Sequence, residues 1–88
     1  MGEVALKYRI MPESPDSDIE NIVSKLSEVI PNDASVGAHE VKPFAFGLNA
    51  IIVAILGIDR DGFATEVEEG LNGLPEVQTV VLEAQSLI

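Results

Sequence analysis

The chain has 88 residues, so we expect a single domain, residues 1–88, built around one hydrophobic core. Its hydrophobic content of 47% favours a packed globule over disorder, and the absence of cysteine excludes disulfides, thiolate metal sites and a cysteine nucleophile. With 15 acidic and 5 basic residues the net charge is -10, which argues against direct binding of nucleic acid, because such binding draws its free energy from basic side chains.

No targeting or membrane-spanning segment is expected. The chain begins Met1-Gly2-Glu3, with an acid where a secretory signal has basic residues. The apolar stretch from Leu48 to Leu56 is too short for a bilayer, which requires about 20 apolar residues. We therefore expect a cytoplasmic protein without a membrane partner.

The first third of the chain predicts a strand followed by a helix. Apolar and polar residues alternate from Glu3 to Ile10, which is the period of a strand with one buried face. Ser17 and Glu20 then have the spacing of a capping box. Apolar residues recur at steps of three and four up to Ile30, just before Pro31, so we expect an amphipathic helix of about four turns.

The middle of the chain predicts an edge strand, a turn and a central strand. The alternation from Ser35 to Lys42 is weak and contains Gly37, as is typical of a short edge strand. A turn follows at Pro43–Gly47. The segment Leu48–Leu56 is apolar on both alternate faces except at Asn49, which favours a place in the middle of a sheet.

The last third predicts a second helix and a final strand. Apolar residues recur at helical spacing from Phe63 to Leu74, and Pro75 follows as an end signal. Strand composition returns from Val77 to Ala84, before a polar interruption at Gln85-Ser86.

The order strand, helix, strand, strand, helix, strand predicts a ferredoxin-like βαββαβ sandwich of the α+β class. This fold has a four-stranded antiparallel sheet with both helices on one face, and strands one and three should be central. Because the third strand is apolar on both faces, the open face is expected to expose an apolar patch that a partner or a second copy can cover.

No arrangement of residues predicts catalysis, a metal or a cofactor. Four residues match part of a calcium loop: Asp59, Asp61, Gly62 and Glu68. The first ligand position of that loop would be Gly57, so a turn and a helix start explain these residues better. His39, the single histidine, has no neighbouring ligand cluster, and we interpret it as a surface residue. We expect a protein that is not an enzyme.

The turn Pro43-Phe44-Ala45-Phe46-Gly47 is the best candidate for a recognition site. Phe46 offers a large, stiff contact area, and Gly47 tolerates a positive φ and close backbone approach. Together they can present a ring to a partner, although a Phe considered alone more often closes one end of the core, and that interpretation is open for Phe46 as well. Phe44 is either a core residue or a second contact, and the sequence leaves both interpretations open.

Four segments of the chain together resemble one known family. They are Met1-Gly2, Met11-Pro12-Glu13-Ser14-Pro15-Asp16, Ala45-Phe46-Gly47-Leu48 and the acidic second helix near Thr65-Glu66. With these segments the whole chain resembles archaeal translation elongation factor 1-beta, which is similar to the C-terminal exchange domain of its eukaryotic counterpart. The resemblance implies a ferredoxin-like domain that promotes exchange of GDP for GTP on the GTP-binding elongation factor 1-alpha, without a catalytic acid or base.

The resemblance also implies two groups of partner-binding residues. Pro43, Phe46 and Gly47 match the aromatic-glycine loop of the family, and Phe44 lies within it. The second group is Gln85, Ser86 and Leu87, where eukaryotic relatives carry a lysine that reaches the magnesium site of the partner. Ser86 stands where that base would fall. Because serine forms hydrogen bonds but carries no positive charge, the resemblance alone does not carry the magnesium-displacing role over to this chain.

Three other functions fit the same order of elements. The main alternative is a regulatory or ligand-sensing module that dimerises through its open sheet face, whereas a monomer is favoured for an exchange factor. An RNA-binding domain would need a basic surface and an aromatic pair on its central strands. An acylphosphatase-like enzyme would need an arginine in the loop Met11–Asp16, which has none.

Overall fold

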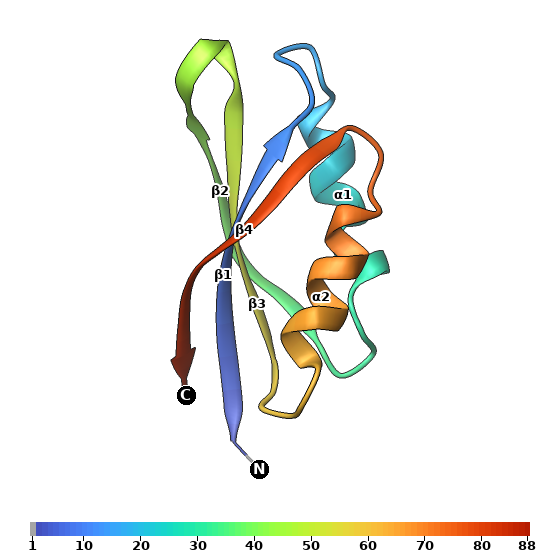
Figure 1. The fold of residues 1–88 in the computed structure, drawn as a ribbon, viewed down its shortest axis with the longest axis vertical. Coiled ribbons are helices and arrows are strands. Elements are labelled where there is room, and N and C mark those ends of the chain that lie inside the picture. Colours follow the sequence, from blue (N-terminus) through green and yellow to red (C-terminus); the bar gives the residue numbers. More distant parts are fainter. Residues whose placement is uncertain (1) are drawn as a thin grey trace.

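The computed structural model describes residues 2–88, apart from the side chain of Phe46, and has a ferredoxin-like α+β fold (Figure 1). The elements are, in order, β1 (Glu3–Pro12), α1 (Ile19–Val29), β2 (Ser35–Pro43), the 3-10 turn η1 (Ala45–Gly47), β3 (Asn49–Ile58), α2 (Phe63–Asn72) and β4 (Val77–Leu87). The antiparallel sheet has the order β2-β3-β1-β4, and both helices cover one face. The predicted fold, with strands one and three central, is confirmed.

The hydrophobic core fills the space between the sheet and the two helices. Its largest members lie on the helix-facing side of the central strands and on the sheet-facing side of the helices: Leu6, Tyr8, Ile10, Ile51, Ile55, Ile22, Leu26 and Leu71. The Tyr8 hydroxyl donates a hydrogen bond to the Glu68 carboxylate of α2 at 3.1 Å. Burial raises the pKa of the Tyr8 hydroxyl far above its ordinary value, and the negative charge of Glu68 adds to this effect.

Two glycines allow backbone and ring to approach closely inside this layer. A Cβ atom at Gly70 of α2 would overlap the carbonyl oxygen of Val29, the last residue of α1. A Cβ atom at Gly57 of β3 would overlap the buried ring of Phe63. The two helices therefore touch through backbone at Gly70, and β3 packs directly on the first residue of α2.

The start of α1 differs from the prediction by one residue. Asp18, not Ser17, is the N-cap, and its carboxylate accepts a hydrogen bond from the Asn21 amide at 3.1 Å. The predicted capping box of Ser17 with Glu20 is wrong. The Ser17 hydroxyl instead accepts a hydrogen bond from the Ser14 amide at 3.2 Å, so it closes the preceding turn.

Several element ends also differ from the predictions. α1 ends at Val29 after 11 residues, because Ile30 adopts an extended backbone ahead of a proline. β3 continues to Ile58. β4 continues through Gln85-Ser86 to Leu87, because this segment remains paired with β1. An edge strand tolerates polar residues, since much of its surface meets water.

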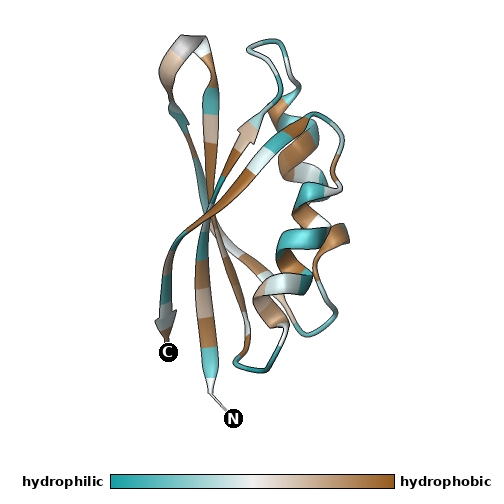
Figure 2. Cartoon of the chain, viewed as in Figure 1, coloured by the Kyte–Doolittle hydropathy of each residue, from teal (hydrophilic) through white to brown (hydrophobic). Residues whose placement is uncertain are grey.

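The face of the sheet opposite the helices is open. Hydrophobic positions recur along both central strands (Figure 2). On β3, Ile51, Val53 and Ile55 are fully buried under the helices, whereas Ile52 and Ala54 are half-buried on the open face. β3 is thus apolar on both faces, as the sequence predicts.

Candidate functional site

The aromatic turn, residues Pro43–Gly47, lies at one end of the sheet between β2 and β3 (Figure 1). The Phe44 amide donates a hydrogen bond to the Leu48 carbonyl at 2.7 Å, which closes the turn. Gly47 has a φ of 76°, in the left-handed region that favours glycine. The Pro15 side chain of the β1–α1 loop lies 4.0 Å from the point where a Cβ atom of Gly47 would stand. The loop after β1 therefore borders the turn.

Phe44 is an exposed aromatic residue and not part of the core. Its side chain is 47% exposed, and its ring lies over the guanidinium of Arg9, with Cζ 5.1 Å from the ring centroid. Arg9 also forms an ion pair with Glu83 of β4, with 3.1 Å between Nη1 and Oε2. One guanidinium thus connects the turn to β1 and β4. The predicted contact at Phe46 concerns a side chain that lies outside the described residues.

The sequence-based predictions did not include Arg9. The alternation of β1 does place Arg9 on the open face, opposite to the buried Tyr8 and Ile10. This position on the open face is the feature of the sequence that could have pointed to Arg9. Nothing in the sequence shows that Phe44 folds back over this face, because the contact depends on the geometry of the turn.

The C-terminal segment, residues Gln85–Leu87, lies at the edge of the sheet on β4. All three side chains are exposed, and Leu87 is 70% exposed. Gln85 pairs with Leu6 and Ser86 with Ala5. Because paired residues of antiparallel strands point to the same face, Gln85 and Leu87 point to the helix side, whereas Ser86 points to the open face.

The structure does not bring the two predicted contact groups together. Ser86 aligns through Ala5 with Leu56 of β3, while Pro43 pairs with Asn49 at the other end of that strand. Seven residue steps separate Asn49 from Leu56, so at about 3.3 Å per residue the groups are roughly 23 Å apart along the sheet. Figure 1 shows the aromatic turn and the C-terminus at opposite ends of the molecule.

The open face carries a shallow depression between these two groups. Its volume is about 390 Å³, and it is lined by the polar residues Lys7, His39, Glu40 and Ser86 and by apolar residues that include Ala5, Ala38, Ile52, Ala54 and Ala84. Most of the lining residues are apolar, so the depression can accept a mainly apolar surface with polar groups beside it. It extends the surface next to Ser86 toward the middle of the sheet.

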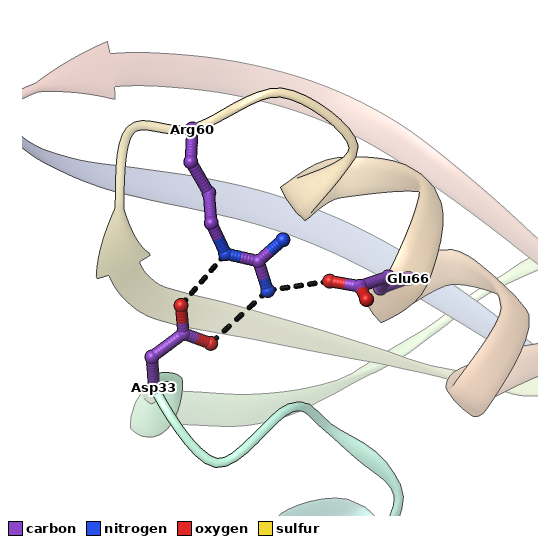
Figure 3. A network of polar contacts seen from close by, with 3 residues as sticks. All are labelled: Asp33, Arg60 and Glu66. Atoms are coloured by element: carbon purple, nitrogen blue, oxygen red, sulfur yellow. Dashed lines mark hydrogen bonds and ion pairs between the residues drawn. The ribbon is translucent and has the colours of Figure 1, made fainter.

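Three charged residues form a network (Figure 3). The β3–α2 loop, which carries one of them, lies at the end of the molecule opposite to the aromatic turn (Figure 1). Arg60, in the β3–α2 loop, donates hydrogen bonds to Asp33 at 2.7 and 3.2 Å and pairs with Glu66 of α2. The hydrogen bond from Arg60 lowers the pKa of Asp33 below its ordinary value. Because both carboxylates are engaged, the network serves to join two loops to α2.

The residues of the calcium-loop match do not form a metal site. Glu68 accepts the hydrogen bond from Tyr8, and Gly62 is the N-cap of α2 with a φ of 81°. Within residues 2–88, no three His, Cys, Asp or Glu side chains are placed to hold a metal ion. In the same part of the chain, no helix is long and apolar enough to cross a membrane.

Comparison with known proteins identifies the family of this chain. The family model of the EF-1 guanine nucleotide exchange domain matches residues 5–88. The chain belongs to this family. The exchange domain is also similar to three archaeal proteins named elongation factor 1-beta.

The protein from Methanosarcina mazei is 42% identical over 86 residues, which cover 96% of the exchange domain and 97% of the relative. The protein from Methanococcoides burtonii is 40% identical over 80 residues, covering 91% and 90% of the two chains. The protein from Halorubrum lacusprofundi is 35% identical over 83 residues, covering 94% of each chain. The likeness therefore extends over nearly the full length.

Family membership confirms the resemblance and the function predicted from it. The exchange domain is a translation elongation factor that exchanges GDP for GTP on elongation factor 1-alpha, and it is not an enzyme. The alternative of a ligand-sensing module has no comparable support.

Proposed function

We propose that the exchange domain promotes release of GDP by holding elongation factor 1-alpha at two separate points, the aromatic turn and the C-terminal segment. Such a factor needs no acid or base, because it binds more tightly to a state in which the partner's magnesium and phosphate contacts are disturbed. The observation that supports this mechanism is the position of two exposed groups at opposite ends of one packed sheet. A single small domain can thereby span two regions of its partner.

In this proposal the aromatic turn provides the apolar anchor. Phe46 and Phe44 supply rings, which carry a large share of the binding energy in many interfaces. Pro43 restricts the backbone before the turn, and Gly47 adopts the left-handed conformation that lets the turn close. The shape of the turn is therefore largely set before the partner arrives.

The C-terminal segment acts by contact and hydrogen bonding in this proposal. Leu87 offers apolar surface, and the Gln85 amide and the Ser86 hydroxyl offer donors and acceptors. None of the three carries a positive charge. We therefore expect that this segment does not displace the partner's magnesium ion by charge.

Release of labelled GDP from the cognate elongation factor 1-alpha tests the proposed function. Phe46→Ala should raise the concentration of exchange domain needed for half-maximal acceleration by about tenfold, the usual effect of removing an aromatic anchor. The free energy of unfolding should change little, whereas loss of a core phenylalanine costs about 3 to 5 kcal/mol. Equal losses of activity and folded fraction would mean that Phe46 is a core residue.

Removal of the chain from Gln85 onward tests the second contact. This truncation also removes strand pairing between β4 and β1, so thermal unfolding must be measured alongside. Leu87→Ala, which leaves the backbone intact, is the milder variant. If both variants fold and both release GDP at the wild-type rate, the C-terminal contact is wrong.

We also propose that the exchange domain acts as a monomer in the cytoplasm, without direct contact to nucleic acid. The net charge of -10 supports the last point, since it disfavours approach to a phosphate backbone. Sedimentation equilibrium gives the oligomeric state. A stable dimer at the concentrations used in the release assay would contradict this part of the proposal.

A further inference from the structure

Arg9 is a residue of the open face whose guanidinium both stacks on an aromatic ring and forms an ion pair. It stands on β1 between Ile52 of β3 and Val81 of β4, the residues that pair with it on either side. Its side chain is 29% exposed. The Phe44 ring covers the guanidinium at 5.1 Å, and Glu83 binds its Nη1 atom at 3.1 Å.

The Nε atom of Arg9 is buried and has no hydrogen-bond partner among the residues that the structure describes. Burying a donor without a partner is unfavourable, so other contacts must hold the guanidinium in this position. The ring of Phe44 and the carboxylate of Glu83 are the contacts available. A planar guanidinium can stack on the ring with one face and pair with the carboxylate along its edge, which an ammonium group cannot do.

Among the described residues, three contacts connect the aromatic turn to its surroundings: the pairing of Pro43 with Asn49, the Pro15 side chain next to Gly47, and the contact of Phe44 with Arg9. Two hydrogen bonds close the turn: the Phe44 amide donates to the Leu48 carbonyl, and the Leu48 amide donates to the Ala45 carbonyl at 3.2 Å. Both bonds are local to residues 44–48. They set the shape of the turn. The contact of Phe44 with Arg9 joins the turn to the central strand β1.

We propose that Arg9 is a positioning residue for the aromatic turn. By holding Phe44 against the open face, its guanidinium sets the direction in which the turn meets the partner. A turn that is already oriented loses less conformational freedom on binding, so the contact with the partner is stronger without any additional interface. This inference rests on the proposed role of the turn in exchange.

Arg9→Met tests the inference, because methionine keeps an apolar stem of similar size but cannot stack as a cation or pair with Glu83. Lys7→Met is the matched control: Lys7 lies on the same strand and face, and no aromatic contact or ion pair involves it among the described residues. Arg9→Lys keeps the charge without the planar group. Glu83→Gln loosens Arg9 without removing it.

The first readout is GDP release from elongation factor 1-alpha at increasing concentrations of exchange domain. Arg9→Met should raise the half-maximal concentration about threefold to fivefold and leave the maximal rate unchanged, which is the scale of one partly exposed cation–π contact. Glu83→Gln should have a smaller effect in the same direction, and Arg9→Lys should restore part of the loss. For Lys7→Met the decisive comparison is the order parameters below, because Lys7 also lines the depression next to Ser86.

The second readout does not depend on exchange. Backbone order parameters from NMR should fall at residues 45–47 in Arg9→Met and stay unchanged in Lys7→Met. Unchanged order parameters in a folded Arg9→Met domain would overturn the positioning role. If the wild-type domain fails to release GDP, the proposed function is wrong, and the order parameters still decide whether Arg9 orients the turn.

Discussion

Replacing Gly70 with alanine tests whether the two helices touch through backbone. Gly70 lies in the last turn of α2, where alanine is still intrinsically better than glycine, by about 1 kcal/mol at most. On helix propensity alone, Gly70→Ala should therefore stabilise the protein. The structure predicts the opposite sign, because the new methyl group meets α1.

The size of the effect follows from the contact. The added Cβ atom would lie 2.9 Å from the carbonyl carbon of Val29 and closer still to its oxygen, whereas ordinary contact begins at 3.4 Å. The obstacle is backbone, so no side-chain rotation relieves the overlap and the helices must move apart. Overpacking of this kind costs about 1 to 3 kcal/mol, and we expect a value near the upper end. After the gain in propensity, the free energy of unfolding should fall by about 2 kcal/mol.

Thermal unfolding followed by circular dichroism measures this loss. For a domain of this size, about 2 kcal/mol corresponds to a fall in Tm of roughly 8 to 16 °C. Gly73→Ala is the matched control: Gly73 has an ordinary right-handed conformation, and its Cβ atom would lie 3.4 Å or more from any neighbour. It should change the free energy of unfolding by less than about 0.5 kcal/mol. An unchanged or higher Tm for Gly70→Ala would refute the close approach of the helices.

Three further predictions concern groups away from the interface. Burial raises the pKa of Tyr8 above its ordinary value of 10.0, so the protein should lose stability as the pH rises above that value. The absorbance of tyrosinate should stay absent until the protein unfolds. Ionisation of Tyr8 in the folded state near the ordinary pKa would contradict this prediction. The lowered pKa of Asp33 means that its contribution to stability is present above the ordinary value of 3.8 and is lost as the pH falls through the folded value. In Arg60→Gln, an NMR titration should show the Asp33 pKa return toward that ordinary value, and an unchanged pKa would exclude the hydrogen bond as its cause. Asp18→Ala should lower the free energy of unfolding by about 1 kcal/mol, because the N-cap is lost. Ser17→Ala should lower it by less. If urea unfolding showed the larger loss for Ser17→Ala, Ser17 would be the cap.

The fold was predictable because each strand carries its own burial pattern. β1 alternates so regularly that its buried face is unambiguous, and β3 is apolar on both faces, which only a central strand requires. The N-cap was not predictable in the same way. Ser17 and Asp18 are both good caps, and the choice depends on the hydrogen bond of Ser17 with Ser14, which requires the folded loop.

The candidate site was predictable only as two separate segments. The aromatic turn and the C-terminal segment each stand out in the sequence, but their separation depends on strand register. Arg9 illustrates the same limit, because its partners Phe44 and Glu83 lie 35 and 74 residues away in the chain. Local patterns do not encode contacts over such separations.

The distance between the aromatic turn and the C-terminal segment gives the proposed mechanism a way to work without catalysis. The strands between the two contact groups are the buried centre of the core, with Tyr8, Ile51 and Val53 fully enclosed. A close-packed core resists deformation, so the two groups are held at a nearly fixed distance. On the proposed mechanism, the partner can satisfy both contacts only in a conformation that matches this distance. The rigid spacing then selects the partner's nucleotide-releasing state, and neither contact needs to supply a charge.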